Sequence, residues 1–153
     1  MTENKEVLGK LQKYCAYQER CHSEVRHKLL SLNVYGDTLE EVIAQLIKDD
    51  FLNEQRFAET YAGGKFRIKK WGKQKIIQSL KQKKVSDYCI KKGLQVISSE
   101  DYSNSLQNLA QKYIRQNQNK SLPLFHLRRK TIQFLQRKGY EYPLIVETLD
   151  GIL

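Results

Sequence analysis

One spacing of apolar residues occurs three times in this chain of 153 residues and limits the folds that it can adopt. In each copy, four apolar positions are separated by 3, 10 and 4 residues. The copies are Leu29, Leu32, Val42 and Leu46; Ile77, Leu80, Ile90 and Leu94; and Ile132, Leu135, Ile145 and Leu149. Separations of three and four place side chains on one helix face, and the gap of ten leaves room for a turn. The pattern predicts a repeated pair of helices.

Residues that start helices recur in register with this spacing. Thr38, Ser86 and Glu141 occupy the equivalent place before the later helix of each copy. Thr38 with Glu41 fits a capping box, and Ser86 followed by an aspartate puts an acceptor and an anion at a helix start. We therefore expect the later helix of each copy to begin there.

Residues that end helices recur in the same way. Gly36 and Gly139 occupy one equivalent place, where we expect the helix to end in a left-handed residue. Lys84 stands there in the second copy, so it should adopt this conformation at a cost of roughly 1 kcal/mol. The register also predicts equivalent buried positions for Leu32, Leu80 and Leu135.

Each copy is preceded by a further stretch with helical spacing. These stretches contain Leu8, Leu11 and Cys15; Phe57, Ala58 and Tyr61; and Leu109, Ala110 and Tyr113. Asn53 is expected to cap the second of them, and Pro123 and Pro143 suit the first turns of two later helices. Residues 98–105 and 117–121 are expected to be linkers.

The fold predicted from these patterns is all-α. It consists of three tandem three-helix repeats stacked into an elongated, curved array, because small units bury little surface alone. The repeats are expected at residues 1–52, 53–99 and 100–153, and the middle one is strongly basic.

The excess positive charge is concentrated in one stretch. The whole chain has a formal net charge of +10, and residues 61–92 alone hold eleven Lys/Arg against one acid, Asp87. Apolar residues are interleaved with these cations, which argues against a disordered tail. A folded cationic module indicates a polyanionic partner, with nucleic acid as the first candidate.

The candidate binding residues are the cations of this stretch and a weaker cluster in the third repeat. They are Lys65, Arg67, Lys69, Lys70, Lys73, Lys75, Lys81, Lys83, Arg128, Arg129 and Lys130. A helix over 65–75 would place Lys65, Lys69 and Lys73 on one exposed face, where lysine reads phosphate spacing and not base sequence. We expect Phe66 and Trp71 to pack inward more than to stack on bases.

The sequence lacks the motifs of common active sites. It contains no phosphate-binding loop and no dinucleotide-binding glycine pattern. Cys15, Cys21, His22 and His27 are close in sequence, but their spacing fits no common zinc template. We therefore expect a protein that is not an enzyme, with no cofactor and no metal.

Cellular location is also constrained. Three cysteines without a Cys-x-x-Cys pair favour reduced thiols in a cytoplasmic protein. No apolar run approaches the length of a membrane span, and the first residues lack the form of a signal peptide. We expect a cytoplasmic monomer with no membrane partner.

Three segments carry motifs of packing residues at fixed spacing: residues 14–25 with Lys28-Leu29, residues 50–58 with Tyr61, and Trp71-Gly72 leading into Ile76 and Leu80. These segments resemble the RecX family, whose members regulate the RecA recombinase. The resemblance covers roughly residues 10–97, and the third repeat is similar mainly in its spacing. Two positions depart from the family pattern. Asn53-Glu54 replaces an acidic pair, and Lys84 replaces a helix-ending glycine.

The resemblance implies a non-enzymatic modulator with tandem three-helix repeats, active in recombination, DNA repair and the SOS response. Such a protein binds along the groove of the RecA filament on single-stranded DNA and usually inhibits ATP hydrolysis and strand exchange. The implied partners are the RecA filament and single-stranded DNA, with duplex DNA as a further candidate. Both DNA phosphates and acidic patches of RecA remain open as contacts of the basic face, as do inhibition and stimulation. A free-standing nonspecific or helix-turn-helix-like nucleic-acid-binding protein is the alternative.

Overall fold

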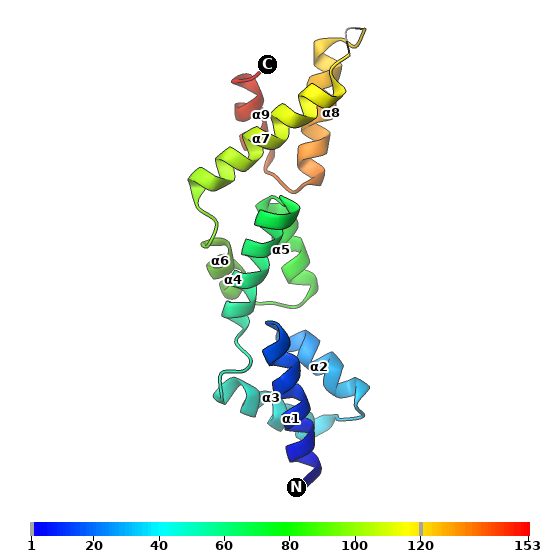
Figure 1. The fold of residues 1–153 in the computed structure, drawn as a ribbon, viewed down its shortest axis with the longest axis vertical. Helices are drawn as coiled ribbons and strands as arrows, with labels where there is room; N and C mark the ends of the chain where they lie inside the picture. Colours follow the sequence, from blue (N-terminus) through cyan, green and yellow to red (C-terminus); the bar gives the residue numbers. More distant parts are fainter. Residues whose placement is uncertain (1, 120) are drawn as a thin grey trace. The chain divides into compact units, whose positions relative to one another are not determined.

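The computed structural model describes residues 2–119 and 121–153, and this part of the chain is helical with no β-strand (Figure 1). The first three helices are α1 (Thr2–Tyr17), α2 (His22–Ser31) and α3 (Gly36–Lys48). Next come α4 (Glu54–Gly64), a π-helix η1 (Lys65–Lys69), α5 (Lys73–Gln82) and α6 (Asp87–Leu94). The last are α7 (Ser99–Asn117), α8 (Leu124–Arg137) and α9 (Tyr142–Asp150). This order confirms the all-α fold of tandem three-helix repeats.

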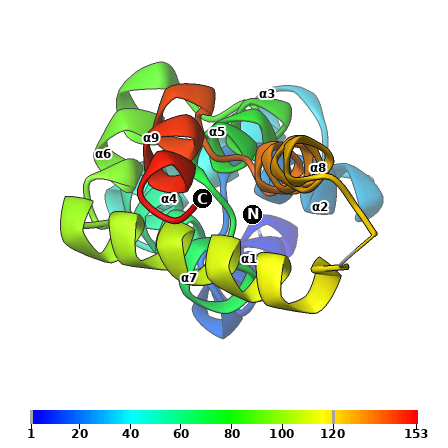
Figure 2. The same cartoon turned by 90° about the horizontal axis from the view of Figure 1, so that it is seen from above.

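The helices form two compact units, and the middle repeat contributes to both. Unit 1 contains the chain up to Tyr61 together with Leu80–Leu94, and unit 2 contains Ala62–Ser79 and Gln95–Leu153. In unit 1, α1 and α2 both pack on α3. Their core is formed by Leu11, Cys15, Val25, Leu29, Leu39, Val42, Ile43, Leu46 and Leu52. In unit 2, α7, α8 and α9 pack on one another (Figure 2).

The same helix ending closes the middle helix of each repeat. The left-handed residue is Asn33 with φ 61°, Lys84 with φ 62° and Gly139 with φ 101°. The amide after it donates back across the last turn, from Val34 to Leu29, Val85 to Leu80 and Tyr140 to Leu135, at N···O distances of 3.0, 3.1 and 3.1 Å. These bonds define a Schellman motif. Each accepting leucine is 0% exposed.

The predicted register is confirmed for the second and third repeats and is wrong for the first. Leu29 occupies the buried place expected of Leu32, which is only half-buried. Asn33 ends α2, whereas Gly36, although left-handed with φ 64°, is the first residue of α3. A shift of three residues keeps side chains on nearly the same helix face, so periodicity alone does not separate the two registers.

The predicted helix starts are confirmed at three positions and wrong at one. Ser86 Oγ accepts from the Cys89 amide at 3.2 Å at the start of α6, and Glu141 is the N-cap residue of α9. Asn53 Oδ1 accepts from the Arg56 amide at 3.0 Å and caps α4. Thr38, however, lies inside α3, so its predicted capping box does not start that helix.

The helix α7 begins earlier than the composition of its first residues indicates. Residues 98–105 were expected to be a linker, but Ser98 caps α7 by accepting from the Asp101 amide at 3.1 Å. The serine and acidic residues of this segment favour a helix start for the same reasons that they favour loops. Pro143 lies in the first turn of α9 as predicted, whereas Pro123 is the residue just before α8. Within the other predicted linker, 117–121, Lys120 lies outside the described residues.

Replacing Lys84 with Gly should raise the free energy of unfolding by up to about 1 kcal/mol. The predicted left-handed conformation of Lys84 is confirmed, and glycine adopts it without the penalty of a Cβ atom. The larger entropy of glycine in the unfolded chain offsets part of this gain. Urea denaturation followed by circular dichroism measures the effect. Lys84→Ala is the control, because it removes the same cation and keeps the Cβ atom; a stability loss with Gly would contradict the prediction.

Candidate nucleic-acid interface

The basic segment, residues 61–92, is not one continuous helix over residues 65–75 as predicted. The π-helix η1 follows α4 directly, Lys70 ends it in a left-handed conformation with φ 59°, and α5 begins only at Lys73. The prediction that Lys65, Lys69 and Lys73 share one exposed helix face is therefore wrong. The chain turns here because the segment is held by another part of unit 2.

Two glycines allow direct backbone contact between the basic segment and the turn between α8 and α9. The Gly72 amide donates to the Lys138 carbonyl at 2.7 Å, and the Gln74 amide donates to the Gly139 carbonyl at 2.9 Å. A Cβ atom at Gly72 would lie 2.3 Å from the carbonyl carbon of Gly139. We call this contact of Gly72 with Gly139 the glycine crossing. It fixes the start of α5 against the turn between α8 and α9.

Aromatic rings lie next to the glycine crossing. The Tyr102 ring centroid is 5.0 Å from that of Tyr140 and 5.9 Å from that of Phe66. All three side chains are buried, which confirms that Phe66 packs inward. They form an aromatic cluster, defined by these three residues, that joins η1 to α7 and to the turn before α9.

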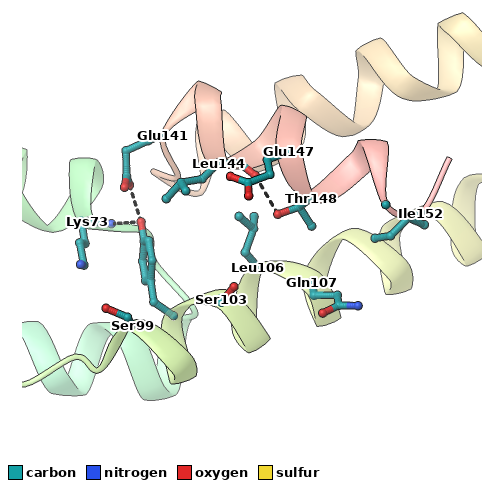
Figure 3. A pocket seen from close by; sticks show the side chains of 12 residues that line it. Lys73, Ser99, Ser103, Leu106, Gln107, Glu141, Leu144, Glu147, Thr148 and Ile152 are labelled. Carbon is teal, nitrogen blue, oxygen red and sulfur yellow. Dashed lines mark hydrogen bonds between the residues drawn. The ribbon is translucent and has the colours of Figure 1, made fainter.

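The hydroxyls of Tyr102 and Tyr140 form hydrogen bonds with the backbone on either side of the turn between η1 and α5. Tyr140 donates to the Lys70 carbonyl at 3.1 Å. Tyr102 accepts from the Lys73 amide at 2.9 Å and donates to the Glu141 carboxylate. Figure 3 shows Lys73 and Glu141 among the residues that line a pocket of about 510 Å³, whose other lining residues come mostly from α7 and α9.

Burial keeps these hydroxyls protonated. It raises the pKa of Tyr140, and it raises the pKa of Tyr102 further together with the hydrogen bond to Glu141. Both residues are therefore neutral donors well above physiological pH. The basic segment is held by hydrogen bonds that do not depend on pH in the physiological range.

The six cations of residues 65–75 separate into two sets. The ammonium groups of Lys65 and Lys75 lie 5.0 and 4.7 Å from the centroid of the half-buried Trp71 ring. The Lys73 ammonium lies 4.7 Å from the Tyr102 centroid. These three lysines contact aromatic rings by cation–π interactions, and those of Lys65 and Lys75 compete with a base for the Trp71 ring.

The other set is exposed. Arg67, Lys69 and Lys70 are exposed, and Ile68 between them is 77% exposed. We call residues 67–70 the basic tip. A hydrogen bond holds the backbone of the tip, because the Lys138 ammonium donates to the Lys69 carbonyl at 3.2 Å. The tip therefore presents three cations from a fixed backbone.

Two predicted residues of α5 and the turn after it belong to unit 1. Lys81 is exposed on α5. Lys83 is half-buried, and its ammonium lies 3.5 Å from the Glu24 carboxylate. Lys83 is therefore engaged in an ion pair, whereas Lys81 is exposed to solvent.

The predicted cations of the third repeat lie on α8. The Arg128 guanidinium pairs with the Asp150 carboxylate at 2.7 Å, while Arg129 and Lys130 are exposed. Charge pairing at Arg128 leaves two of the three predicted cations available to a polyanion.

A groove that no sequence motif indicates runs beside the basic tip. This groove has a volume of about 600 Å³, and Arg67 and Lys70 line it from the tip. Asn104, Asn108 and Lys112 line it from α7. Their spacing of four residues is a helical signal, but the serine and acidic residues at the start of α7 favour a linker and obscure it.

Positive charge is divided unequally between the compact units. Counted over the sequence, unit 2 has 14 Lys/Arg against 5 Asp/Glu, or +9, and unit 1 has 13 against 12, or +1. The basic tip and the groove therefore lie in the unit whose long-range field attracts anions.

The cysteines and histidines that are close in sequence do not gather into a metal site in the described part of the chain. In residues 2–119 and 121–153, no three His, Cys, Asp or Glu side chains are grouped so that they could hold a metal ion. Cys15 and Cys21 are buried, and burial raises the pKa of both thiols. His22 Nδ1 lies 3.1 Å from the Glu54 carboxylate.

None of the helices within the described ranges is long and apolar enough to cross a membrane.

Comparison with known proteins assigns the family. Residues 53–94 match the family model for the second three-helix domain of RecX, and residues 100–149 match the model for the third. Together the two matches cover more than half of the chain.

Curated relatives and a solved structure agree with these matches. The regulatory protein RecX of Streptococcus uberis is 31% identical over 140 residues, which are 92% of this chain and 52% of that protein. The regulatory protein RecX of Clostridium perfringens (strain 13) is 31% identical over 123 residues, 80% of this chain and 57% of that protein. The chain thus spans about half the length of these relatives. The crystal structure of RecX from Lactobacillus salivarius superposes with a TM-score of 0.88 at 24% identity, covering 99% of this chain and 97% of that one. This chain belongs to the RecX family.

Proposed function

We propose that this protein is a non-enzymatic regulator that binds the RecA filament on single-stranded DNA and inhibits its ATP hydrolysis and strand exchange. The observation that carries the proposal is the similarity to RecX regulatory proteins over almost the whole chain. The concentration of positive charge in unit 2 supports it independently, because a filament on DNA is a long polyanion.

Tandem repeats suit such a target. A RecA filament presents the same protein surface at every protomer, with DNA running through it. A chain of linked modules gains effective concentration from each added contact, so weak contacts with protein and DNA sum to firm binding. The basic tip is the proposed DNA-facing element, since Arg67, Lys69 and Lys70 are exposed on an anchored backbone.

Hydrolysis of ATP by the cognate RecA on single-stranded DNA tests this function directly. Addition of this protein should lower the steady-state rate, and an oligonucleotide coated with RecA should bind it more tightly than the same oligonucleotide alone. The triple variant Arg67→Gln, Lys69→Gln, Lys70→Gln should inhibit less than the wild type.

A matched control removes the same number of charges from unit 1. Lys10→Gln, Lys13→Gln and Lys48→Gln change three exposed lysines and should leave inhibition unchanged. An increase in the hydrolysis rate would overturn inhibition in favour of stimulation. Equal affinity for DNA coated with RecA and for bare DNA would contradict the proposal that this protein regulates RecA.

The second candidate function is that of a free-standing nucleic-acid-binding protein. The net charge of +9 in unit 2 favours it, because such a charge binds any polyanion without a protein partner. In that case RecA would add nothing to the affinity, and the tip variant would lose all binding. Residual binding of this variant to the filament supports the regulator instead.

A further inference from the structure

The groove beside the basic tip has a defined chemical character. One wall is the tip, with Arg67 and Lys70, and the other is a face of α7, with Asn104, Asn108 and Lys112. Its volume of about 600 Å³ is in the range of small-ligand sites. Three cations, two amides and one carboxylate, that of Asp101, therefore line one space within unit 2, and the cations outnumber the acid.

The wall formed by the tip is held in place before any ligand binds. Lys70 is left-handed, a conformation that is strained for a lysine, and its carbonyl accepts from the buried Tyr140 hydroxyl. Phe66, which also lines the groove, is buried in the aromatic cluster. Strained residues with fixed partners cluster at ligand sites, where they reduce the ordering that binding requires.

The wall formed by α7 carries neutral hydrogen-bonding groups in a row. Asn104, Asn108 and Lys112 recur every four residues, which places them along one helix face. An asparagine amide offers both a donor and an acceptor, whereas an acidic protein surface needs donors alone. Nucleotides combine an anionic phosphate with a sugar and a base edge that carry both kinds of group. The row therefore favours a nucleotide over a patch of carboxylates.

We propose that this groove binds a nucleotide of a single-stranded nucleic acid. Arg67, Lys70 and Lys112 contact the phosphate backbone, and Asn104 and Asn108 contact the sugar or the base edge. This assignment names a DNA-contacting site for the proposed function and rests on that function only for the identity of the strand. The site differs from the stripe of lysines expected from the sequence, since α7 supplies half of it.

Charge removal in the groove gives the first test. Binding of a fluorescent oligothymidylate is measured by anisotropy over a range of salt concentrations. Arg67→Gln, Lys70→Gln, Lys112→Gln should lower the affinity about tenfold or more at low salt and flatten its salt dependence by about 0.7 per lost contact. The control variant Lys10→Gln, Lys13→Gln, Lys48→Gln should behave like the wild type. Equal losses in both variants would overturn the proposal, because they would reflect total charge and no site.

The amides give a second test that does not depend on charge. Asn104→Ala with Asn108→Ala should lower the affinity for the oligothymidylate by roughly three- to tenfold, because each change removes hydrogen bonds. The salt dependence should stay as in the wild type. Both positions are exposed, so folding should survive, and circular dichroism checks this. Unchanged affinity in this double variant would overturn the assignment of α7.

Measurements with RecA distinguish this site from the proposed function. If groove variants lose oligothymidylate binding while the wild type has no effect on RecA, the site stands and the regulator fails. If the wild type inhibits RecA and the groove variants bind oligothymidylate normally, the regulator stands and the site fails. If the groove variants lose only their binding to the RecA filament, the groove contacts an acidic protein surface. That outcome would overturn the proposal that it binds a nucleotide.

Discussion

Leu135→Ala should lower the free energy of unfolding by about 2–5 kcal/mol. Leu135 is completely buried on α8, and its carbonyl accepts the Tyr140 amide in the Schellman motif that ends the helix. Truncation removes apolar contacts and leaves a cavity that the surrounding helices fill only partly. Chemical denaturation followed by circular dichroism measures the loss. Leu124→Ala is the control, since Leu124 lies on the same helix and is 61% exposed, and its effect should be small.

The same experiment in unit 1 tests the corrected register. Leu29 is completely buried, whereas Leu32 is only half-buried. Leu29→Ala should therefore cost clearly more stability than Leu32→Ala. A larger stability loss for Leu32→Ala would support the register predicted from the sequence alone. It would contradict the equivalence of Leu29, Leu80 and Leu135.

Gly72→Ala should destabilise unit 2 by about 3 kcal/mol or more. The added Cβ atom would lie 2.3 Å from the Gly139 carbonyl carbon and 2.4 Å from the Tyr140 amide nitrogen. Both atoms are backbone and yield little, so the glycine crossing must open and its two hydrogen bonds must lengthen. Forced overpacking of this kind costs about 1–3 kcal/mol in general and more where backbone is displaced. Thermal denaturation gives the effect.

A glycine eight residues earlier provides the matched control. Gly64 ends α4 with φ −65° and ψ −47°, and a Cβ atom added there would meet no atom of the described residues within 4 Å. Gly64→Ala should therefore be neutral or stabilise the helix by roughly 0.5–1 kcal/mol. Loss of oligothymidylate binding in Gly72→Ala but not in Gly64→Ala would show that the glycine crossing positions the basic tip. Equal stability of the two variants would contradict the close approach.

Local patterns in the sequence determined the helices and most of their ends. The three apolar spacings predict the repeats, capping chemistry predicts the roles of Asn53 and Ser86, and the register predicts a left-handed Lys84. These features depend on contacts within a few residues of the chain, which periodicity and capping chemistry describe well. Net charge and its concentration in the middle of the chain are also properties of the sequence alone.

Only the tertiary structure decided how the basic residues are presented. Gly72 contacts Gly139 across 67 residues of sequence, and Tyr140 donates to the carbonyl of Lys70 across 70. Such contacts end the predicted helix at Lys70, place three lysines over aromatic rings and leave residues 67–70 as an exposed tip. Helical periodicity specifies which face of a helix is apolar, but it carries no information about which distant segment covers that face. For the same reason the groove beside α7 becomes visible only once the repeats are folded.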